Sequence, residues 1–236
     1  MVTDTLKRMR ILVAGSKIRI VCAALIFNFL FVVMARSQVH QRVDVGLFSR
    51  NDTSGWEIRD FEGASSYAVS RVDGKQVLVA DSQQSASMYY KKIEVDLEVT
   101  PMLNWSWRKE RTIDPGNELE KNGDDYVARI YLVIDGGLFK FRTTALNYVW
   151  SYRHVRQDVW NNPFAGKNVK MLSLRDASDP QGQWFNEKRN VVMDFKRLHG
   201  VDARKIDGVA IMTDSDNSGL SARALYGDIY FDAGME

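Results

Sequence analysis

The stretch YAVSRVDGKQVLVA, residues 67–80, decides the fold class of this chain. Two runs rich in β-branched and apolar residues, 67–72 and 76–80, flank the dipeptide Asp73-Gly74. A tight hairpin turn needs positive φ angles that Asp-Gly tolerates, so this dipeptide between two such runs is a strong hairpin signal. The stretch therefore predicts two antiparallel strands joined by a short turn.

Similar runs recur along the rest of the chain. Residues 93–99 alternate apolar and acidic side chains, which is typical of a strand with one buried and one wet face. Further strands are predicted at 87–90, 102–107, 126–134, 145–151, 169–174, 209–213 and 226–231. In the ambiguous segment 184–195 we expect a helical turn at 186–189 and then a strand at 190–195. About ten short strands at regular spacing predict an all-β sandwich or barrel.

The first 35 residues differ from the rest of the chain. An uncharged apolar run, 20–35, follows five basic residues, Lys7, Arg8, Arg10, Lys17 and Arg19. This order is the signature of a secretory signal, and we expect cleavage after Ala35 and a periplasmic or secreted domain. The run is shorter than the roughly 20 apolar residues of a membrane-spanning helix. It is close enough that an uncleaved anchor at 20–35 in the inner membrane stays the alternative, and Met9 is an alternative start.

We therefore divide the chain into a signal peptide or anchor (1–35), a polar lead-in (36–55) and a single β-sandwich domain (56–236). The only cysteine, Cys22, lies in the leader, so the predicted domain has no disulfide, catalytic thiol or cysteine-bound metal. The net charge of +2 also comes from the leader, and basic and acidic residues are interspersed after it. No clustered basic face is visible, so nucleic-acid binding is not expected, and membrane contact is expected only through the N-terminal segment.

A polar loop over 114–125 carries three candidate catalytic carboxylates, Glu118, Asp124 and Asp125. A pair of such groups on either side of a sugar bond is the machinery of a glycoside hydrolase. The alternative is a solvated loop in which Asp124 or Asp125 pairs with Arg129 or Arg108.

The segment 214–219 begins like a calcium loop, with oxygen-bearing side chains at alternate positions and a glycine at the sixth. Its twelfth position is Leu225 and not a glutamate, so it is no EF-hand. A calcium site of another kind would use Asp214 and Asp216, with Asp228 as a further ligand. The alternative is a β-turn whose side chains bond their own backbone. No other cofactor is expected.

Strand alternation suggests a binding face. On the predicted strand 126–134, Arg129 and Tyr131 lie on the face opposite Ile130 and Leu132. A mixed polar and aromatic face built from Arg108, Arg129, Tyr131 and Asn147 is a candidate groove for a polar ligand. Trp160, in a polar stretch, is the tryptophan most expected to be exposed. The alternative is an internal salt-bridge network with Asp125 or Asp194 as partners. The candidate ligand-binding residues are Arg108, Arg129, Tyr131, Asn147 and Trp160.

The sequence contains no motif for zinc binding, nucleophilic catalysis or nucleotide binding. The three histidines, His40, His154 and His199, lack the spacing of a zinc site. No nucleophile elbow, P-loop or dinucleotide fingerprint occurs.

Several motifs in a fixed order resemble the bacterial domain-of-unknown-function family numbered 3047. They lie at 105–108, 121–131, 145–151, 189–194, 209–217 and 226–229, and the resemblance covers roughly residues 55–233. It implies a secreted or periplasmic bacterial protein and carries no established activity. At the level of the fold, the pattern is also similar to the galactose-binding-like jelly rolls of carbohydrate-binding modules.

The leading hypothesis is thus a jelly-roll-like antiparallel β-sandwich that binds a polar small molecule or glycan outside the cytoplasm without catalysis. The first alternative is a carboxylate-based glycan hydrolase that uses the 114–125 loop. The second is a structural or partner-binding protein of the cell envelope.

Overall fold

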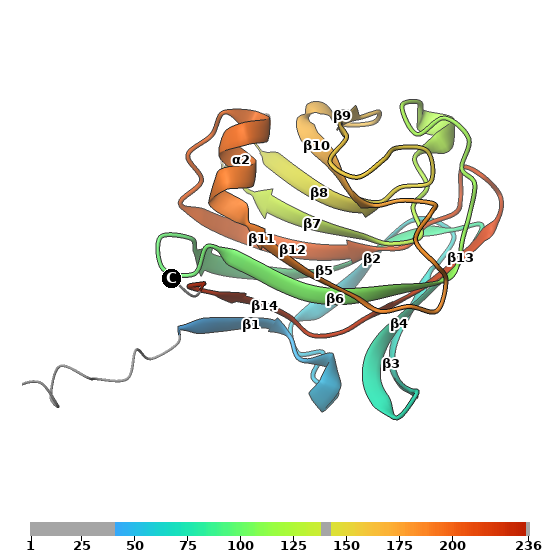
Figure 1. Ribbon diagram of the computed structural model, residues 1–236, viewed down its shortest axis with the longest axis horizontal. Coiled ribbons are helices and arrows are strands. Elements are labelled where there is room, and N and C mark those ends of the chain that lie inside the picture. The colour runs from blue at the N-terminus through green and yellow to red at the C-terminus, as the bar shows by residue number, and fades with distance from the viewer. Residues whose placement is uncertain (1–40, 138–142, 235–236) are drawn as a thin grey trace, which may run out of the picture. The chain divides into compact units, whose positions relative to one another are not determined.

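The computed structural model describes residues 41–137 and 143–234 (Figure 1). The predicted signal or anchor segment, 1–35, falls outside these residues. Among the residues described, none of the helices has the length and apolar character needed to span a membrane.

The described residues form fourteen strands in two sheets. Sheet I contains β1 (Arg42–Gly46), β3 (Ser66–Val72), β4 (Lys75–Gln83), β6 (Met102–Arg111), β11 (Phe185–Asn190), β13 (Ser221–Tyr226) and β14 (Ile229–Asp232). Sheet II contains β2 (Trp56–Glu62), β5 (Ala86–Asp96), β7 (Arg129–Ile134), β8 (Thr144–Trp150), β9 (Val159–Asn162), β10 (Gly166–Arg175) and β12 (Lys205–Met212). Within the described ranges, the helical elements are the 3-10 turns η1 (Phe48–Arg50) and η2 (Lys121–Gly123) and the α-helix α2 (Val191–His199).

Sheet I has the order β1-β14-β6-β13-β4-β3, and β11 pairs with the remaining side of β6. Strands β13 and β14 pair with successive parts of β6, because the chain breaks at Gly227 and Asp228 between them. Strand β1 pairs with β14 and places Arg42 opposite Asp232. The first and last described strands are therefore neighbours.

Sheet II has the order β2-β5-β12-β7-β8-β10-β9. Its pairs are antiparallel except that of β8 with β10, which is parallel. The expected antiparallel, jelly-roll-like sandwich is confirmed, with this one parallel pair as a local departure.

The predicted hairpin is present as β3 and β4. Their pairing runs from Ser66 opposite Asp81 to Val72 opposite Lys75. Asp73 and Gly74 have φ angles of 50° and 79°, as a two-residue turn with two left-handed residues requires.

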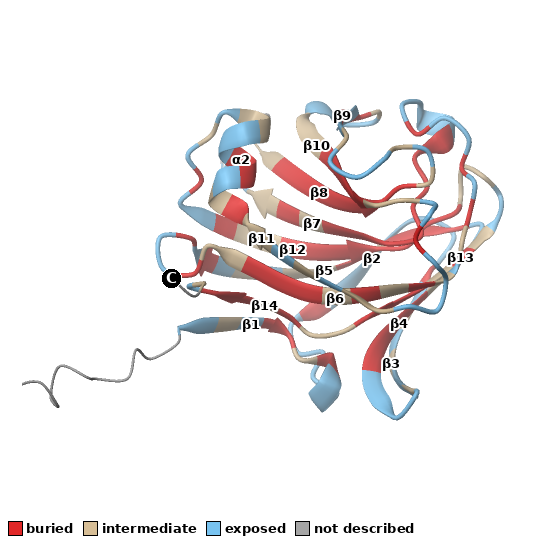
Figure 2. Cartoon of the chain, in the orientation of Figure 1, coloured by how far each residue is buried: buried red, intermediate tan, exposed pale blue. Residues whose placement is uncertain are grey.

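The core lies between the two sheets (Figures 1 and 2). Aromatic rings from the two sheets interdigitate there: Trp105 of β6 stacks on Tyr148 of β8 at 5.4 Å, and Trp107 meets Trp150 at 5.7 Å between ring centroids. Burial of large rings from both sheets supplies the apolar contact that holds a sandwich together.

The expectation for 184–195 was wrong in order. Residues 185–190 form strand β11, and the helix α2 follows it. Asn190 caps this helix by accepting a hydrogen bond from the backbone N–H of Met193 at 3.0 Å, and Gly200 ends it with φ 70°. The inward-facing Val191 and Phe195, four residues apart, favour a helix over a strand here.

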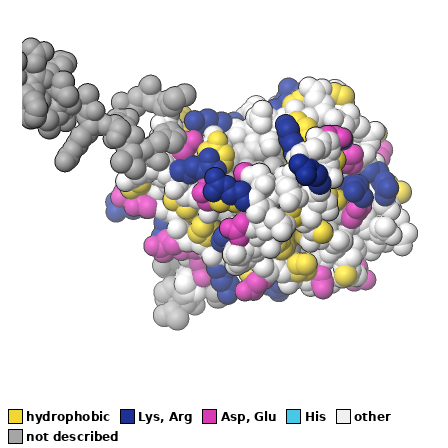
Figure 3. All heavy atoms as spheres, turned by 90° about the horizontal axis from the view of Figure 1, so that it is seen from below, with side chains coloured by type: hydrophobic (Ala, Val, Ile, Leu, Met, Phe, Trp, Pro, Cys, Tyr) yellow, Lys and Arg dark blue, Asp and Glu magenta, His cyan; other side chains and the backbone are white. Residues whose placement is uncertain are grey.

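Two further boundaries differ from expectation. The lead-in 36–55 contains β1, and the predicted strand 226–231 is interrupted at Gly227, where a Cβ atom would lie 2.2 Å from Ser106 Oγ. The face seen from below in Figure 3 carries basic and acidic side chains intermixed, in keeping with the sequence.

The loop between β6 and β7 is anchored by Glu118, which is 1% exposed. Its carboxylate accepts hydrogen bonds from Ser151 Oγ at 2.5 Å and from the backbone N–H of Tyr152 at 2.7 Å. Gly123 packs so closely against the loop that a Cβ atom there would lie 2.2 Å from the backbone oxygen of Asn117. The loop therefore has little freedom just before Asp124 and Asp125.

We expect Gly123→Ala to lower the free energy of unfolding by about 1 to 3 kcal/mol, because the new methyl group overlaps backbone atoms that cannot rotate away. Gly208→Ala is the matched control, since its Cβ would meet only Lys91 O at 3.5 Å. Urea unfolding of both variants measures the difference. Equal stabilities would show that the loop is not packed in this way.

Candidate functional site

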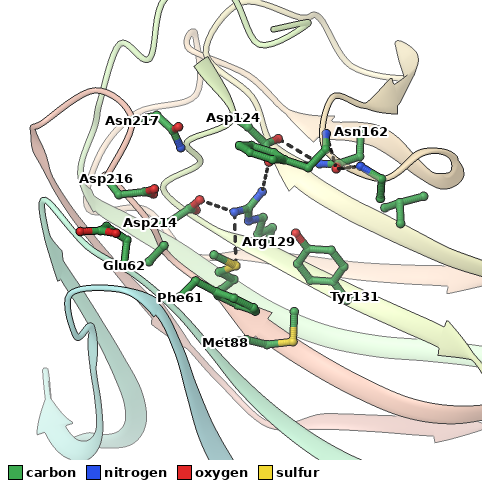
Figure 4. Close-up of a pocket in the computed structure, with 15 residues that line it drawn as sticks. Phe61, Glu62, Met88, Asp124, Arg129, Tyr131, Asn162, Asp214, Asp216 and Asn217 are labelled. Atoms are coloured by element: carbon green, nitrogen blue, oxygen red, sulfur yellow. Dashed lines mark hydrogen bonds and ion pairs between the residues drawn. The ribbon is translucent and has the colours of Figure 1, made fainter. Parts of the chain in front are cut away.

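A pocket of about 560 Å³ opens on the outer face of sheet II (Figure 4). Its apolar lining comes from Phe61, Ala86, Met88, Tyr131, Phe164, Ala165, Val169 and Met212. Its polar lining comes from Glu62, Asp124, Arg129, Asn162, Asp214, Asp216 and Asn217. A volume of this size is typical of small-molecule sites in proteins.

Strand alternation explains how the central residues reach the pocket. Ile130 and Ile211 point into the core, so their neighbours Arg129 and Met212 face outward. The register of the sheet then places Met212 of β12 opposite both Met88 of β5 and Arg129 of β7. The pocket floor is therefore a row of three adjacent strands.

Arg129 is the centre of this floor. Its side chain is 2% exposed, and its guanidinium forms ion pairs with Asp214, through Nη2, and with Asp124, through Nη1 at 3.5 Å (Figure 4). Burial raises the pKa of the Asp214 carboxyl, and the guanidinium opposes that rise. Burial likewise raises the pKa of Asp124 against the same cation. A buried guanidinium needs such partners, because an unpaired charge is costly in the interior.

The ion pair also organises the rim of the pocket. Asp124 accepts two hydrogen bonds from Asn162 Nδ2, each of 3.1 Å. The oxygen of the same Asn162 amide accepts from the backbone N–H groups of Phe164, at 3.1 Å, and Ala165, at 2.9 Å. Arg129 is thus connected through the side chains of Asp124 and Asn162 to the backbone of Phe164, whose ring is exposed.

A shift in the pairing register of β2 with β5 shapes another part of the pocket rim. Phe61 and Glu62 are consecutive in β2, and neighbouring residues of a regular strand point to opposite faces. Here the register against β5 shifts between Asp60 and Glu62, and both Phe61 and Glu62 line the pocket. A bulge re-aims side chains in this way.

Three carboxylates gather beside Arg129. Single oxygens of Asp125, Asp214 and Asp216 lie within 4.8 Å of one another. Asp125 accepts from the backbone N–H of Ser218 at 2.6 Å and from Asn217 Nδ2 at 3.1 Å, which ties the 214–219 turn to the loop before β7. Burial and the neighbouring Asp125 raise the pKa of Asp216. Such a group could share a proton or accept a cation, so calcium stays a prediction.

The structure brings only some of the predicted ligand-binding residues together. Arg129 and Tyr131 line the pocket, and Asn147 lies opposite Tyr131 in the sheet but is fully buried. Arg108 is on β6 of sheet I, where it pairs with Asp73 at 2.6 Å. The expectation that Arg108 shares a face with Arg129 was therefore wrong.

Trp160 was expected to be exposed and is 8% exposed. It stacks on His154 at 4.2 Å between ring centroids and forms a small cluster with Tyr126, Val149 and Met171. The polar residues around it in the sequence belong to an edge strand, β9, whose alternate side chains are buried.

Of the predicted catalytic carboxylates, only Asp124 lines the pocket. Glu118 anchors the loop from within the fold, and Asp125 holds the 214–219 turn. Among the predicted calcium ligands, Asp214 and Asp216 lie together, whereas Asp228 accepts hydrogen bonds from Ser49 N at 2.8 Å and Ser49 Oγ at 2.6 Å. Asp228 is not part of the carboxylate cluster.

Sequence reasoning missed the apolar walls and the rim. Alternation assigns Met88 and Met212 to the face opposite Tyr89 and Ile211, but it does not tell which outer face is covered by loops. Phe61 and Glu62 depend on a bulge, and Phe164 on the Asn162 turn, neither of which has a sequence signal of its own.

We expect Arg129→Met to lower the free energy of unfolding by about 3 to 5 kcal/mol, because Asp214 is left buried without its cation. Adding Asp214→Asn should restore part of this loss. The control is Arg204→Met, which removes an exposed partner of Glu98 and should cost at most about 1 kcal/mol. Denaturant unfolding tests the set, and a small loss for Arg129→Met would contradict the role of the ion pair.

We expect Asp216→Asn to raise the melting temperature at pH 8. The raised pKa means that the folded chain holds this proton more tightly than the unfolded chain, so the contribution of Asp216 to stability falls as the pH rises through that pKa. The advantage of the variant should shrink toward low pH. Thermal melts from pH 4 to 8 measure it, with Glu98→Gln as control.

Calcium should raise the melting temperature of the parent chain, and not of the variant, if these carboxylates hold the ion.

No curated protein matches the chain. A family 11 carbohydrate-binding module from Clostridium thermocellum, in complex with a β-1,3-1,4-mixed-linked tetrasaccharide, is similar with a TM-score of 0.48 at 9% identity, over 83% of this chain and 97% of that one. The family 11 module of the cellulosomal cellulase Lic26A-Cel5E of the same organism has a TM-score of 0.47 at 10% identity, over 84% and 98%.

A third similar structure is TmCBM61 in complex with β-1,4-galactotriose, with a TM-score of 0.30 at 10% identity, over 78% of this chain and 88% of that one. The family model described as "Protein of unknown function (DUF3047)" matches residues 54–230, which include every strand of the pocket. The resemblance found in the sequence is therefore confirmed, and the chain belongs to the DUF3047 family.

Proposed function

We propose that this domain is a glycan-binding β-sandwich without catalytic activity, and that its ligand occupies the pocket on the outer face of sheet II. The observation that carries the proposal is the composition of this pocket. Aromatic and apolar side chains form its walls, and hydrogen-bonding groups surround Arg129 at its floor. A sugar ring has an apolar face that packs on aromatic side chains and hydroxyl groups that need polar partners.

Two exposed rings support this assignment. Phe61 is 51% exposed and Phe164 is 58% exposed, and both line the pocket. Large apolar side chains at the mouth of a concave site are typical of ligand contact. They are the surfaces on which we expect a sugar ring to pack.

Binding without catalysis is favoured because the three carboxylates predicted for a hydrolase, Glu118, Asp124 and Asp125, are engaged within the fold. Asp124 and Asp214 pair with Arg129, and Asp125 accepts backbone and amide N–H groups. A general acid or base must be free to reach the substrate. If the domain were a hydrolase instead, the glycan-binding experiment described next would detect cleaved glycans. We further propose export by the N-terminal segment, to be tested by fractionating cells that express the full chain.

We expect Phe164→Ala to weaken binding of a glycan ligand by roughly tenfold, because it removes one aromatic wall of the pocket. Val155→Ala is the matched control, since Val155 is 63% exposed and does not line the pocket. A glycan-array screen of the full chain identifies ligands, and calorimetry then compares the variants. Cleaved glycans would favour the hydrolase. Equal binding by Phe164→Ala and the parent would place the glycan elsewhere.

A further inference from the structure

The charges that line the pocket do not balance. Four carboxylates, of Glu62, Asp124, Asp214 and Asp216, face one guanidinium, of Arg129. Arg129 forms its two ion pairs with Asp124 and Asp214. Glu62 and Asp216 form no ion pair within the described part of the chain. The lining residues therefore carry excess negative charge. Outside the lining, the Arg59 guanidinium lies 5.2 Å from the centroid of the Phe61 ring.

Glu62 and Asp216 lie on one side of the pocket, away from Asn162 (Figure 4). Glu62 is exposed, and Oδ1 of Asp216 is buried without a hydrogen-bond partner in the described residues. A carboxylate oxygen of Asp125 lies within 4.8 Å of one of Asp216 and adds to the negative potential there. Carboxylates concentrated in a concave site attract a cation.

Arg129 provides an independent sign that a ligand completes this site. Its side chain is 2% exposed and lines the pocket, yet its Nε–H group has no hydrogen-bond partner among the described residues. Buried donors of this kind are normally satisfied. An oxygen atom of a bound sugar that reaches this group would supply the missing acceptor beside the carboxylates of Glu62 and Asp216.

The bulge in β2 joins these features on one rim. It brings Phe61 and Glu62 to the pocket together, so an apolar ring and a carboxylate stand side by side. A ligand that matches this rim has an apolar face next to a positive charge. An amino sugar with a free amine has both.

We propose that the glycan bound here carries a protonated primary amine, which lies between Glu62 and Asp216 while its sugar ring packs on Phe61. This inference rests on the proposed glycan-binding function. A metal ion fits less well, because calcium needs six to eight oxygen ligands. In this cluster Asp214 is bound by the Arg129 guanidinium and Asp125 by N–H groups.

The test compares two probes that differ only in the amine, tetra-glucosamine and tetra-N-acetylglucosamine, by calorimetry on the full chain. We expect the free amine form to bind about tenfold more tightly, as close charge pairs in binding sites do, and the advantage to shrink at high salt. Glu62→Gln and Asp216→Asn should each remove most of that advantage. They should weaken binding of the acetylated probe much less than binding of the free amine form, since acetylation removes the charge that these carboxylates bind.

Glu98→Gln is the control, because it removes an exposed carboxylate that does not line the pocket. Circular dichroism of each variant checks that the fold is intact. Equal or tighter binding of the acetylated probe would overturn the amine inference and leave glycan binding standing. Binding that requires calcium and is lost in Asp216→Asn would overturn it in favour of a metal site. No binding of either probe, nor of any glycan on an array, would overturn the proposed function as well.

Discussion

The buried ion pair of Arg129 with Asp214 is the constraint on which the site depends. A guanidinium with 2% exposure must be matched by carboxylates, and these come from two segments distant in sequence, the loop before β7 and the turn after β12. Each carboxylate is held in turn, Asp214 by the backbone N–H of Tyr126 and Asp124 by Asn162. Because Asn162 also fixes the backbone at Phe164, one charge placed on the outer face of sheet II organises floor, loop and rim together.

The two faces of sheet II are therefore stabilised by different interactions. The inner face is a conventional aromatic core, in which Trp105 and Trp107 of sheet I meet Tyr148 and Trp150. The outer face buries polar groups under loops, and each such group costs free energy unless it is paired. Two of the buried polar atoms that lack a partner among the described residues, Arg129 Nε and Asp216 Oδ1, belong to residues that line the pocket. A ligand that reaches such an unsatisfied atom forms a hydrogen bond with it at little cost. A hydrogen bond to an exposed group must first replace one with water.

Local rules predicted what depends on neighbours in sequence. The Asp73-Gly74 hairpin follows from turn chemistry and is confirmed. Strand parity separates Arg129 and Tyr131, which line the pocket, from Ile130 and Leu132, which lie in the core. Parity cannot tell which strands share a sheet, so Arg108 was assigned to the wrong face. It also cannot detect a bulge, and thus Phe61 and Glu62 were missed. In the segment 185–199 the predicted order of helix and strand was wrong. Asn190 caps a helix that begins at Val191, whereas the apolar residues after Asn190 were predicted to form a strand.

The pairing of β1 with β14 has a consequence for the topology of the chain. Since Arg42 lies opposite Asp232, the two ends of the described domain meet at one edge of sheet I, whereas the pocket belongs to sheet II. Ends this close can be joined by a short linker and the chain reopened at an exposed turn such as Asp73-Gly74. The domain is thus suited to circular permutation and to insertion within a host protein, and in either arrangement the junction joins strands of sheet I and not the strands that line the pocket.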